Sequence, residues 1–592
     1  MNRIKDTPRI PIIKNDGNIL SMLHSLWRTF SSQRRMQFKW LFLLIFFASF
    51  SELMSIGALL PFLAILISPE RFFASPIAQI LVSYMNIGGP IELLLPLTII
   101  FVVLTFFAGF IRILLLWVSI RISYAIGSDL SVDIYRRTLY RPYTFHCEQN
   151  SSEIIDAISN KSTSLICVVT NCLNLISSGF ILVTLLFGLL LFNPFVTLCS
   201  FAGFLIIYLL IGFLTRNQQR HNSSRMARES SRCIKVLQEG IGGIRDILID
   251  GSQKIYCHKY QSSDLFLRKA QASNLFISSS PRYIVESLGI MLIALLAFTL
   301  TRGENAFDKT VPILGVFAMA AQRMLPLFQQ IYASWVGISG ARVALGDVLE
   351  LLTSPLPSDH IVQNCESLSF MKEIELRNIS FQFSSKEKYI LRNLNLTISK
   401  GDRIGIVGIT GSGKSTLVDM LMGLLEPTKG QILIDGQTIN RDNRRAWQDH
   451  IAHVPQNIYL ADCTIEQNIA FGVDGDLIDS ERVVMAARQA QLSSTIESWP
   501  LGYKTIVGER GIRLSGGQRQ RIGVARALYK STADVIIFDE ATSALDSKTE
   551  REVIDAIETL SPEITLIMIA HRLSTLDNCT KVINLDSGTI RE

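Results

Sequence analysis

The stretch Arg403-Ile-Gly-Ile-Val-Gly-Ile-Thr-Gly-Ser-Gly-Lys-Ser-Thr416 decides the fold of the C-terminal part of the chain. From Gly408 onward it fits the pattern G-x-x-x-x-G-K-[S/T], in which a glycine-rich loop joins a strand to a helix. A β-rich run precedes the loop, and apolar residues with helical spacing follow it, from Leu417 to Leu424. This context predicts an α/β domain built around a phosphate-binding loop.

The loop residues have the chemistry that binding a nucleoside triphosphate requires. Glycines let successive backbone N–H groups surround the phosphates, and the helix N-terminus adds positive potential. Lys414 can reach the β- and γ-phosphates, and Ser415 can ligate Mg²⁺. We therefore expect ATP and Mg²⁺ as cofactors. The expected phosphate-side residues are Gly408, Gly411, Ser412, Gly413, Lys414, Ser415 and Thr416.

A second stretch, Val535-Ile-Ile-Phe-Asp-Glu540, complements the loop. Four apolar residues predict a buried parallel strand, and two carboxylates follow at its C-terminal end, where active sites of open α/β sheets lie. Asp539 is expected on the Mg²⁺ side, and Glu540 can polarise the attacking water. The predicted chemistry is phosphoryl transfer to water, in which positioning and charge stabilisation lower most of the barrier.

These two stretches, with Leu514-Ser-Gly-Gly-Gln518 between them, resemble the ATP-binding cassette (ABC) family over residues 371–592. By that resemblance, the 514–518 stretch is the signature motif, Gln456 is the Q-loop residue that joins Ser415 and Asp539 at the metal, and His571 is the switch histidine. The resemblance implies that Glu540, His571, Gln456 and Asp539 are catalytic. It also implies that Phe383, a position that is usually Tyr in the family, stacks on adenine. The remaining expected ATP contacts are Ser515, Gly516, Gly517, Gln518 and Asp546.

The family resemblance also implies a partner and a way of coupling. One cassette's signature closes over another cassette's phosphate loop, and this chain carries one of each, so we expect a homodimer with two composite, hydrolysing sites. Cytoplasmic helix tips near 142–146 and 248–252 are candidates for docking on the cassette.

Charge density changes abruptly along the chain. Residues 1–350 hold 31 Lys and Arg against 20 Asp and Glu, so about one residue in seven is charged and the net charge is +11. Residues 351–592 hold 26 against 31, so about one residue in four is charged and the net charge is −5. Soluble chains carry roughly 25% charged residues, which the second half matches and the first does not. The step excludes a disordered or disulfide-scaffold protein and predicts a membrane domain joined to a soluble one.

Six apolar runs in the first half are long enough to cross the roughly 30 Å hydrocarbon core. They lie at about 38–68, 92–120, 162–192, 195–215, 279–301 and 311–337. The long connections 121–161 and 216–270 are rich in Arg and Lys, so the positive-inside rule places them, and both termini, in the cytoplasm. Few glycines or prolines interrupt these connections, so we expect the helices to continue beyond the bilayer.

The predicted fold class is therefore multi-domain: an all-α six-helix transmembrane domain, of the type 1 ABC exporter kind by resemblance, followed by an α/β P-loop nucleotide-binding domain. Its expected parts are a cytoplasmic N-terminal segment (1–37), the transmembrane domain (38–350), a linker (351–370) and the nucleotide-binding domain (371–592).

Three arginines in or beside these spans are candidate substrate ligands. Arg112 is expected about 30 Å and Arg323 about 18 Å from the outer surface, at ~1.5 Å per helical residue. A charge in the membrane costs several kcal/mol and normally faces protein or a water-filled cavity. Neither has an acidic residue three or four positions away on its own helix, so we expect both to be available to an anionic substrate. Arg282 is also a candidate, but it can pair with Glu286 at i,i+4.

The surroundings of Glu52, Arg282 and Arg323 resemble the bacterial lipid-linked oligosaccharide flippases of the protein N-glycosylation pathway. That resemblance implies that cavity arginines hold the pyrophosphate of a polyprenyl-diphosphate glycan, in the bacterial inner membrane. Gln330 stands where a further Arg is expected, so the set of cavity arginines is smaller in this chain.

Three alternatives remain open. A general lipid or multidrug exporter shares the fold, whereas a peptide exporter with its own protease needs an N-terminal Cys/His domain, for which the segment ahead of the first apolar run leaves no room. Degraded site residues would favour an ATP-gated channel, whereas Glu540 and His571 are intact in this sequence. The Arg residues of 216–245 are better explained by membrane orientation and headgroup contact than by nucleic acid.

Overall fold

A computed structural model describes residues 18–67, 69–75, 79, 83, 89, 91–191, 194–300, 307–353, 368–383, 388–540, 563–569, 579–586 and 589–591. The chain divides into two compact units. The first comprises Met1–Arg141 and Gln149–Pro355, and the second comprises Pro142–Glu148 and Leu356–Glu592. Of the two expected docking segments, 142–146 therefore belongs to the second unit, while 248–252 belongs to the first.

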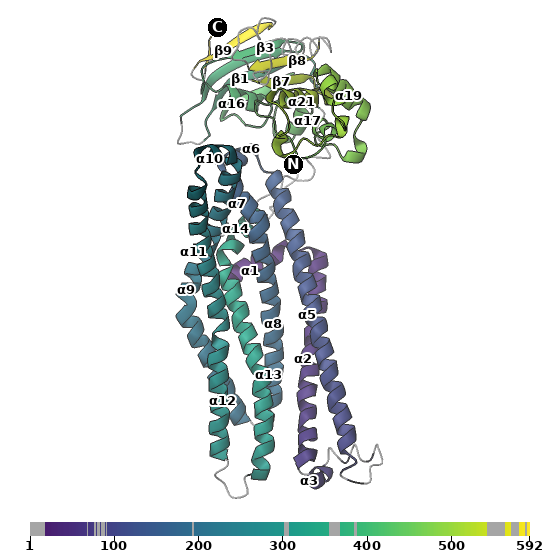
Figure 1. The fold of residues 1–592 in the computed structure, drawn as a ribbon, viewed down its shortest axis with the longest axis vertical. Helices are drawn as coiled ribbons and strands as arrows, with labels where there is room; N and C mark the ends of the chain where they lie inside the picture. Colours follow the sequence, from purple (N-terminus) through teal and green to yellow (C-terminus); the bar gives the residue numbers. More distant parts are fainter. Residues whose placement is uncertain are drawn as a thin grey trace, which may run out of the picture. The chain divides into compact units, whose positions relative to one another are not determined.

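Each of the six predicted spans corresponds to a long helix of the first unit (Figure 1). These helices are α2 (Ser32–Ile67), α5 (Leu94–Leu139), α8 (Ser162–Leu190), α9 (Pro194–Gly242), α12 (Pro281–Leu300) and α13 (Phe307–Gly340). The 46 residues of α5 and the 49 of α9 extend roughly 70 Å. Since a bilayer core is only about 30 Å thick, both helices continue well past it, as the sequence predicts. Within the described residues, four helices, beginning at Ser32, Leu94, Ser151 and Phe201, are long and apolar enough to cross a membrane.

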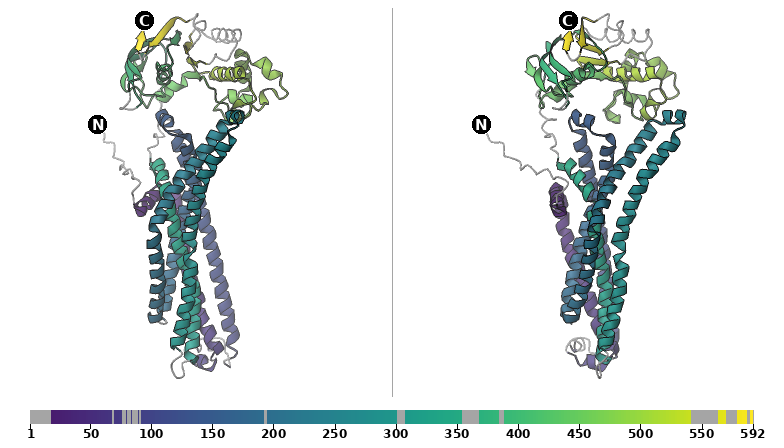
Figure 2. Two further views of the ribbon diagram at one scale, coloured as in Figure 1. Left: turned by 60° about the vertical axis from the view of Figure 1, so that its left-hand side comes forward. Right: turned by 90° about the vertical axis from the view of Figure 1, so that its left-hand side faces the viewer.

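Further helices complete the first unit. They are α1 (Ile19–Thr29), α3 (Pro69–Phe73), α7 (Ser151–Asp156), the π-helical turn η1 (Ala157–Lys161), α10 (Ile244–Asp250), α11 (Gln253–Ser279) and α14 (Arg342–Thr353). Figure 2 shows α9 and α11 running side by side, and the two helices are in contact. α1 lies within the segment that we expected only as a cytoplasmic extension, and it buries Met22 and Leu26.

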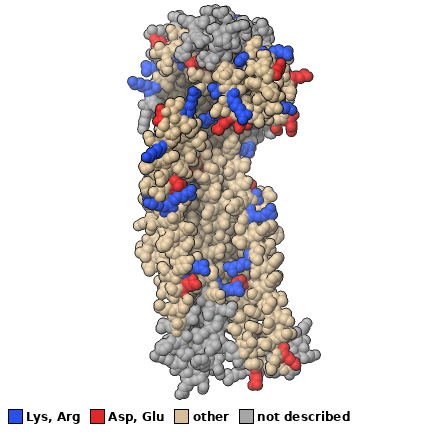
Figure 3. All heavy atoms as spheres, viewed as in Figure 1, with Lys and Arg blue, Asp and Glu red and all other residues tan. Residues whose placement is uncertain are grey.

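Two apolar clusters hold the helices of this unit together. One joins α1, α2, α5, α8 and α14, and the other joins α8, α9, α12 and α13 with single residues of α2 and α11. Large apolar side chains on the outer faces stay exposed, among them Phe106, Phe110 and Phe213. Exposed phenylalanines are costly in water and favourable in lipid. On the face drawn in Figure 3, the described surface of the long helices has broad areas without charged residues, as a membrane domain requires.

The second unit contains two sheets. The antiparallel sheet has the order β2-β1-β4-β5, from strands Glu373–Phe381 (β1), Leu391–Ser399 (β2), Lys429–Ile434 (β4) and Gln437–Thr438 (β5). The larger sheet has the order β10-β9-β3-β8-β7-β6 and is parallel from β9 to β6. Its strands are Arg403–Val407 (β3), Ile451–Val454 (β6), Val535–Asp539 (β7), Thr565–Ile569 (β8), Lys581–Asp586 (β9) and Thr589–Arg591 (β10).

Helices cover the parallel sheet on both faces. They are α16 (Lys414–Leu421), α17 (Arg444–Asp449), α18 (Ile465–Ile469), α19 (Ser480–Gln489), α20 (Ser493–Glu497) and α21 (Gly516–Tyr529), with 3₁₀ turns η2 (Gly475–Leu477), η3 (Gly502–Lys504) and η4 (Glu509–Gly511). The same unit includes α6 (Tyr143–Glu148). One core packs α16 and α17 between the sheets, and a second packs α18, α19 and α21 on the other face. This is the expected α/β architecture.

Candidate functional site

Strand register brings the phosphate loop and the acidic pair to one edge of the parallel sheet. β8 lies between β3 and β7, and Ile569 is paired with Ile406 on one side and Asp539 on the other. Neighbouring strands are about 4.8 Å apart. The carboxyl ends of β3 and β7 are therefore only about 10 Å apart, and the loop after β3 faces the carboxylates after β7.

The phosphate loop is shaped so that side chains are excluded from it. A Cβ at Gly408 would lie 2.3 Å from the Leu585 carbonyl oxygen, and one at Gly413 would lie 2.9 Å from Leu391. Gly411 and Gly413 have φ values of 85° and 101°, which strongly favour glycine. Glycine is therefore required here both for space and for backbone conformation.

Polar groups of the loop point to an anionic ligand. The Lys414 ammonium is buried and donates to the carbonyls of Gly408 (2.8 Å) and Ile409 (3.2 Å). The buried Ser412 hydroxyl makes no hydrogen bond within the described residues. An orphaned buried hydroxyl costs about 1–3 kcal/mol, which a phosphate oxygen would recover. Ser415 and Thr416 lie in the first turn of α16, where backbone N–H groups are free for anions.

The acidic pair meets the predicted Q-loop glutamine. Gln456 Nε2 donates to Glu540 Oε2 at 2.6 Å. Glu540 has a φ of 49°, a conformation that costs a non-glycine residue free energy and that concentrates at functional sites. Burial, with the neighbouring Glu540 charge, raises the pKa of Asp539, and Lys414 partly opposes this. A divalent cation beside Asp539 would reverse the shift, so the charge balance of the site fits a metal-bound triphosphate.

Asp419 is a site residue that the sequence reasoning missed. Burial and the Asp539 charge raise its pKa to about 6. Asp419 in turn contributes to raising the pKa of Tyr143 in α6 to about 12, although burial is the larger cause there. The available signal was its position on α16 four residues after Ser415, which places both side chains on one helix face.

The expected adenine platform and signature motif are also well formed. Phe383 is 41% exposed and packs edge-on against Phe381, with ring centroids 5.0 Å apart. Ser515 caps α21 through a reciprocal capping box with Gln518. Gly516 and Gly517 open the helix, so backbone N–H groups are available at its N-terminus. Asp546 and His571 lie outside the described residues.

Two family models match this chain. The ABC transporter transmembrane region matches residues 41–325, and the ABC transporter model matches residues 391–543. Together they span more than half of the chain, and the second covers the loop, the acidic pair and the signature. The chain belongs to the ABC transporter family.

Individual relatives and a solved structure agree with this assignment. The ATP-dependent lipid A-core flippase of Alkalilimnicola ehrlichii is 30% identical over 63% of this chain and 63% of its own length. The flippase of the same description from Paraburkholderia xenovorans is 28% identical over 78% of this chain and 77% of its own. A bacterial Atm1-family ABC exporter with ATP bound superposes with a TM-score of 0.76 over 94% of both chains, at 22% identity, and so shares the fold. This ABC transporter is an ATPase coupled to transport and a multi-pass membrane protein.

The three candidate substrate arginines have different environments in the transporter. Arg323 Nη1 donates to Glu52, a buried carboxylate on α2. The expectation that Arg323 is available to a substrate without a protein partner is therefore wrong, because its partner lies on a different helix. Arg282 lies 3.8 Å from Glu286, with both side chains more than half exposed, and this is the i,i+4 pair that the sequence allows. Arg112 is exposed on α5 and has no ion pair with any described residue. Among the described residues, no recorded contact joins the three.

Proposed function

We propose that this ABC transporter works as a homodimer in the bacterial inner membrane, with both termini in the cytoplasm. It uses ATP and Mg²⁺ to flip an anionic lipid-linked substrate, a polyprenyl-diphosphate oligosaccharide, to the opposite leaflet. The observation that carries the substrate class is Arg112, an exposed cation on a membrane-spanning helix that has no ion pair with any residue the structure describes. Since an intramembrane charge costs several kcal/mol, an anionic ligand is the expected compensation.

The roles of the ATP-site residues follow from their positions. Lys414 turns from the loop carbonyls to the β- and γ-phosphate oxygens, and the Ser412 hydroxyl and the backbone N–H groups from Gly411 to Thr416 bind the same phosphates. Phe383 stacks on the adenine. Ser415, Gln456 and Asp539 hold Mg²⁺, which when bound neutralises the charge that develops on the phosphoryl group.

Glu540 acts as the general base. Its carboxylate already accepts a hydrogen bond from Gln456, which holds it at the carboxyl edge of the sheet. From there it orients a water molecule and takes its proton as the oxygen attacks phosphorus. His571 completes the catalytic set as the group that senses the γ-phosphate.

Dimerisation supplies the second half of each ATP site. Within the described residues, no recorded contact joins the Ser515–Gln518 signature to the phosphate loop of the same chain. The N-terminus of α21 suits binding of the γ-phosphate that a second cassette holds. The contacts come from Ser515, Gly516, Gly517 and Gln518. Asp546 lies beside the dimer interface. Closure on ATP and reopening after hydrolysis then drive alternating access of the membrane domain.

Each of the three arginines has its own role in binding the substrate. Arg112 binds the diphosphate directly, whereas Arg323 is released to the substrate only when it exchanges Glu52 for a phosphate. Arg282, only weakly held by Glu286, is the third contact. A broader lipid exporter is the second candidate, and the names of the relatives, lipid A-core flippases, favour it.

The test is ATPase activity of the transporter in liposomes that contain either a polyprenyl-diphosphate disaccharide, the same lipid without the sugar, or a neutral polyprenol. We expect several-fold stimulation by both diphosphates and little by polyprenol. Arg112→Gln should raise the half-stimulating diphosphate concentration about tenfold, since loss of one charge-assisted contact costs about 1.5–3 kcal/mol. Arg28→Gln, at an exposed arginine in the last turn of α1, is the control.

The Glu52 carboxylate gives a further discriminating variant. If Arg323 exchanges partners, Glu52→Gln frees it and lowers the half-stimulating diphosphate concentration. An unchanged concentration would show that the Glu52–Arg323 pair is structural. Equal stimulation by neutral polyprenol, with an unaffected Arg112→Gln variant, would rule out the anionic substrate and leave the broader lipid exporter.

A further inference from the structure

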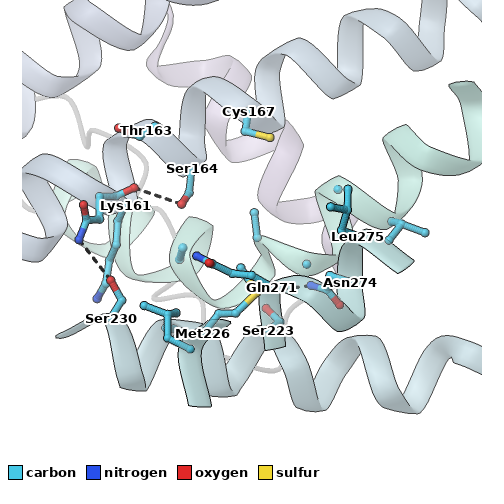
Figure 4. A pocket seen from close by; sticks show the side chains of 18 of the residues that line it. Lys161, Thr163, Ser164, Cys167, Ser223, Met226, Ser230, Gln271, Asn274 and Leu275 are labelled. Atoms are coloured by element: carbon cyan, nitrogen blue, oxygen red, sulfur yellow. Dashed lines mark hydrogen bonds between the residues drawn. The ribbon is translucent and has the colours of Figure 1, made fainter. Parts of the chain in front are cut away.

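A pocket of about 610 Å³, lined by both polar and apolar side chains, lies in the first unit. It is lined by η1 and by parts of α7, α8, α9, α11, α13 and α14. Its volume falls within the roughly 300–1,000 Å³ that is typical of small-molecule sites. Figure 4 shows several of its side chains, including Ser164, Gln271 and Asn274.

The pocket lies beyond the hydrocarbon core. Its α13 residues, from Ala333 to Gly340, are roughly 40–50 Å along the helix from Phe307. Because the core is only about 30 Å thick, the pocket in the proposed orientation lies at the cytoplasmic headgroup level. A lipid headgroup in the inner leaflet would meet it there.

The charged groups of the pocket wall already have partners within the protein. Asp156 is fully buried and accepts hydrogen bonds from Ser230 (2.7 Å), Ser231 (2.6 Å) and Asn160 (3.0 Å). Lys161 pairs with Asp347 at 2.7 Å. The remaining cation, Arg268, pairs with Asp264 at 3.2 Å and also donates to Gln271 Oε1. Lys161 and Arg268 thus face three carboxylates, those of Asp156, Asp347 and Asp264, so the wall has no excess of positive charge with which to attract a phosphate.

The rest of the wall combines apolar side chains with neutral hydrogen-bonding groups. The hydroxyl groups of Thr163 and Ser164 donate to carbonyls one turn earlier, which leaves their oxygens able to accept. Gln271 uses its carbonyl oxygen for Arg268, while no described residue bonds its two amide N–H donors. The π turn at Ala157–Lys161 brings Asn160 and Lys161 to the wall, and π turns are frequent at functional sites. A rim of neutral donors and acceptors suits a ligand rich in hydroxyl groups.

The pocket is also close to a proposed diphosphate contact. Ser278 lines the pocket near the end of α11, and Arg282 follows four residues later at the start of α12. Four helical residues rise about 6 Å. A sugar in the pocket could therefore be bonded directly to a diphosphate at Arg282.

From this we infer that the pocket binds the uncharged saccharide of the lipid-linked substrate on the cytoplasmic side, while the arginines hold the diphosphate. The inference rests on the proposed function and adds a place and a chemistry for the sugar. It gives the transporter a means of selecting glycosylated lipids over the bare carrier lipid.

Cys167 offers a direct test, because it lines the pocket and its side chain is exposed. Wild-type transporter in liposomes is treated with a water-soluble maleimide, and labelling is quantified by peptide mass spectrometry. The lipids are the polyprenyl-diphosphate disaccharide and the same lipid without sugar. Cys257, exposed on α11 but outside the pocket, is the internal control.

We expect the disaccharide lipid to slow labelling of Cys167 at least threefold and to leave Cys257 unchanged, with no slowing by the sugar-free lipid. Gln271→Met should raise the half-stimulating concentration of the disaccharide lipid about tenfold and leave that of the sugar-free lipid unchanged. Gln261→Met, an exposed glutamine on the same helix, should change neither.

The outcomes separate the two proposals. If both lipids stimulate the ATPase but neither protects Cys167, or if both protect it equally, the saccharide pocket is wrong and the flippase proposal stands. If neither lipid stimulates the ATPase and neither protects Cys167, both proposals fail. A Gln271→Met variant that weakens both lipids equally also contradicts a sugar-specific pocket.

Discussion

At the scale of single residues, the ATP site depends on a few groups that are placed to bind an anionic ligand or are held in a strained conformation. Among the described residues, the buried Ser412 hydroxyl lacks a partner and Lys414 donates its hydrogen bonds to loop carbonyls, while Glu540 has a left-handed backbone conformation. Each of these costs folding free energy, and a bound metal–triphosphate recovers much of it. Residue types and spacing predicted these groups because the phosphate loop and the strand end are each a single continuous stretch of sequence.

Asp419 is not predictable in this way, because its character comes from Asp539, a residue much later in the chain that the sheet brings near. Arg323 and Glu52 show the same limitation, since they lie on helices at opposite ends of the membrane domain's sequence. One signal was present: an intramembrane acid and an intramembrane base on different spans tend to pair with each other. Pairing of this kind across helices needs the packing of α2 against α13, which no local pattern supplies.

The raised pKa of Asp419 predicts a pH-dependent stability effect. The carboxyl group has a pKa of about 6 in the folded protein, against an ordinary value near 4. Its ionisation therefore lowers the free energy of unfolding as pH rises through that interval. Asp419→Asn should therefore raise the free energy of unfolding by about 1 kcal/mol at pH 7.5, after discounting for partial exposure, and by much less at pH 4.5. Thermal unfolding of the full-length protein in detergent without nucleotide measures this.

Asp462→Asn, at an exposed carboxylate of the same unit, is the control for Asp419→Asn and should change Tm little at either pH. A gain from Asp419→Asn that is the same at both pH values would contradict the assignment of the charge as the cause.

At the scale of elements, turns and helix ends align the strands that build the site. β4 and β5 are joined by Asp435 and Gly436, which both have positive φ (49° and 83°), as a two-residue type I′ hairpin requires. The Asp435 carboxylate accepts from the backbone N–H groups of Met371 (2.6 Å), Lys372 (2.8 Å) and Glu373 (2.8 Å). It thus fixes the first residues of β1 to the hairpin. The Asp-Gly pair is a readable turn signal, but the three donors belong to a distant, earlier part of the chain and could not be foreseen.

Loss of this carboxylate should weaken the antiparallel sheet. Burial alone would raise the pKa of Asp435, but the backbone N–H groups of Glu373, Met371 and Lys372 outweigh it and leave the pKa below its ordinary value. The stabilisation is therefore present above the unfolded pKa and is lost as pH falls through the folded one. Asp435→Asn keeps the turn conformation and should lower the free energy of unfolding by about 1 kcal/mol at pH 7.

The comparison for Asp435→Asn is Asp442→Asn, at an exposed carboxylate for which no described side-chain partner is recorded. Equilibrium unfolding in urea at pH 7 and pH 3 gives both values. A difference between Asp435→Asn and wild type that persists unchanged at pH 3 would show that the carboxylate charge is not responsible.

At the scale of the whole molecule, the change in charge density near residue 350 corresponds to the division into two units, one that contacts lipid and one that contacts water. The helices of the first unit expose phenylalanines, and the second unit has an ordinary soluble core between its sheets. Composition and hydropathy predicted this division and the order of the long helices, because both reflect contact with lipid or water along continuous segments. The saccharide pocket was not foreseen, because its walls come from seven separate elements.

The proposed dimer predicts complementation between two inactive variants. Lys414→Ala disables the phosphate loop, and Ser515→Arg disables the signature. If each ATP site combines the loop of one protomer with the signature of another, a mixed dimer contains one site that is intact and one that carries both changes. Co-expressed, differently tagged variants purified through both tags should recover roughly half of the wild-type ATPase rate if the two sites act independently. Recovery no greater than for either variant alone would contradict composite sites.

The central claim is that ATP hydrolysis at Glu540 moves an anionic glycolipid between leaflets. It is tested most directly in proteoliposomes that contain a polyprenyl-diphosphate disaccharide, with ATP and a membrane-impermeant glycosidase added outside. In molecules whose cassettes face outward, ATP should transfer the sugar to the lumen, so the glycosidase-accessible fraction falls with wild type. The Glu540→Gln variant should bind ATP but hydrolyse it at least a hundredfold more slowly and leave that fraction unchanged. A wild-type protein that hydrolyses ATP without changing the accessible fraction, or a Glu540→Gln variant that changes it equally, would contradict the account.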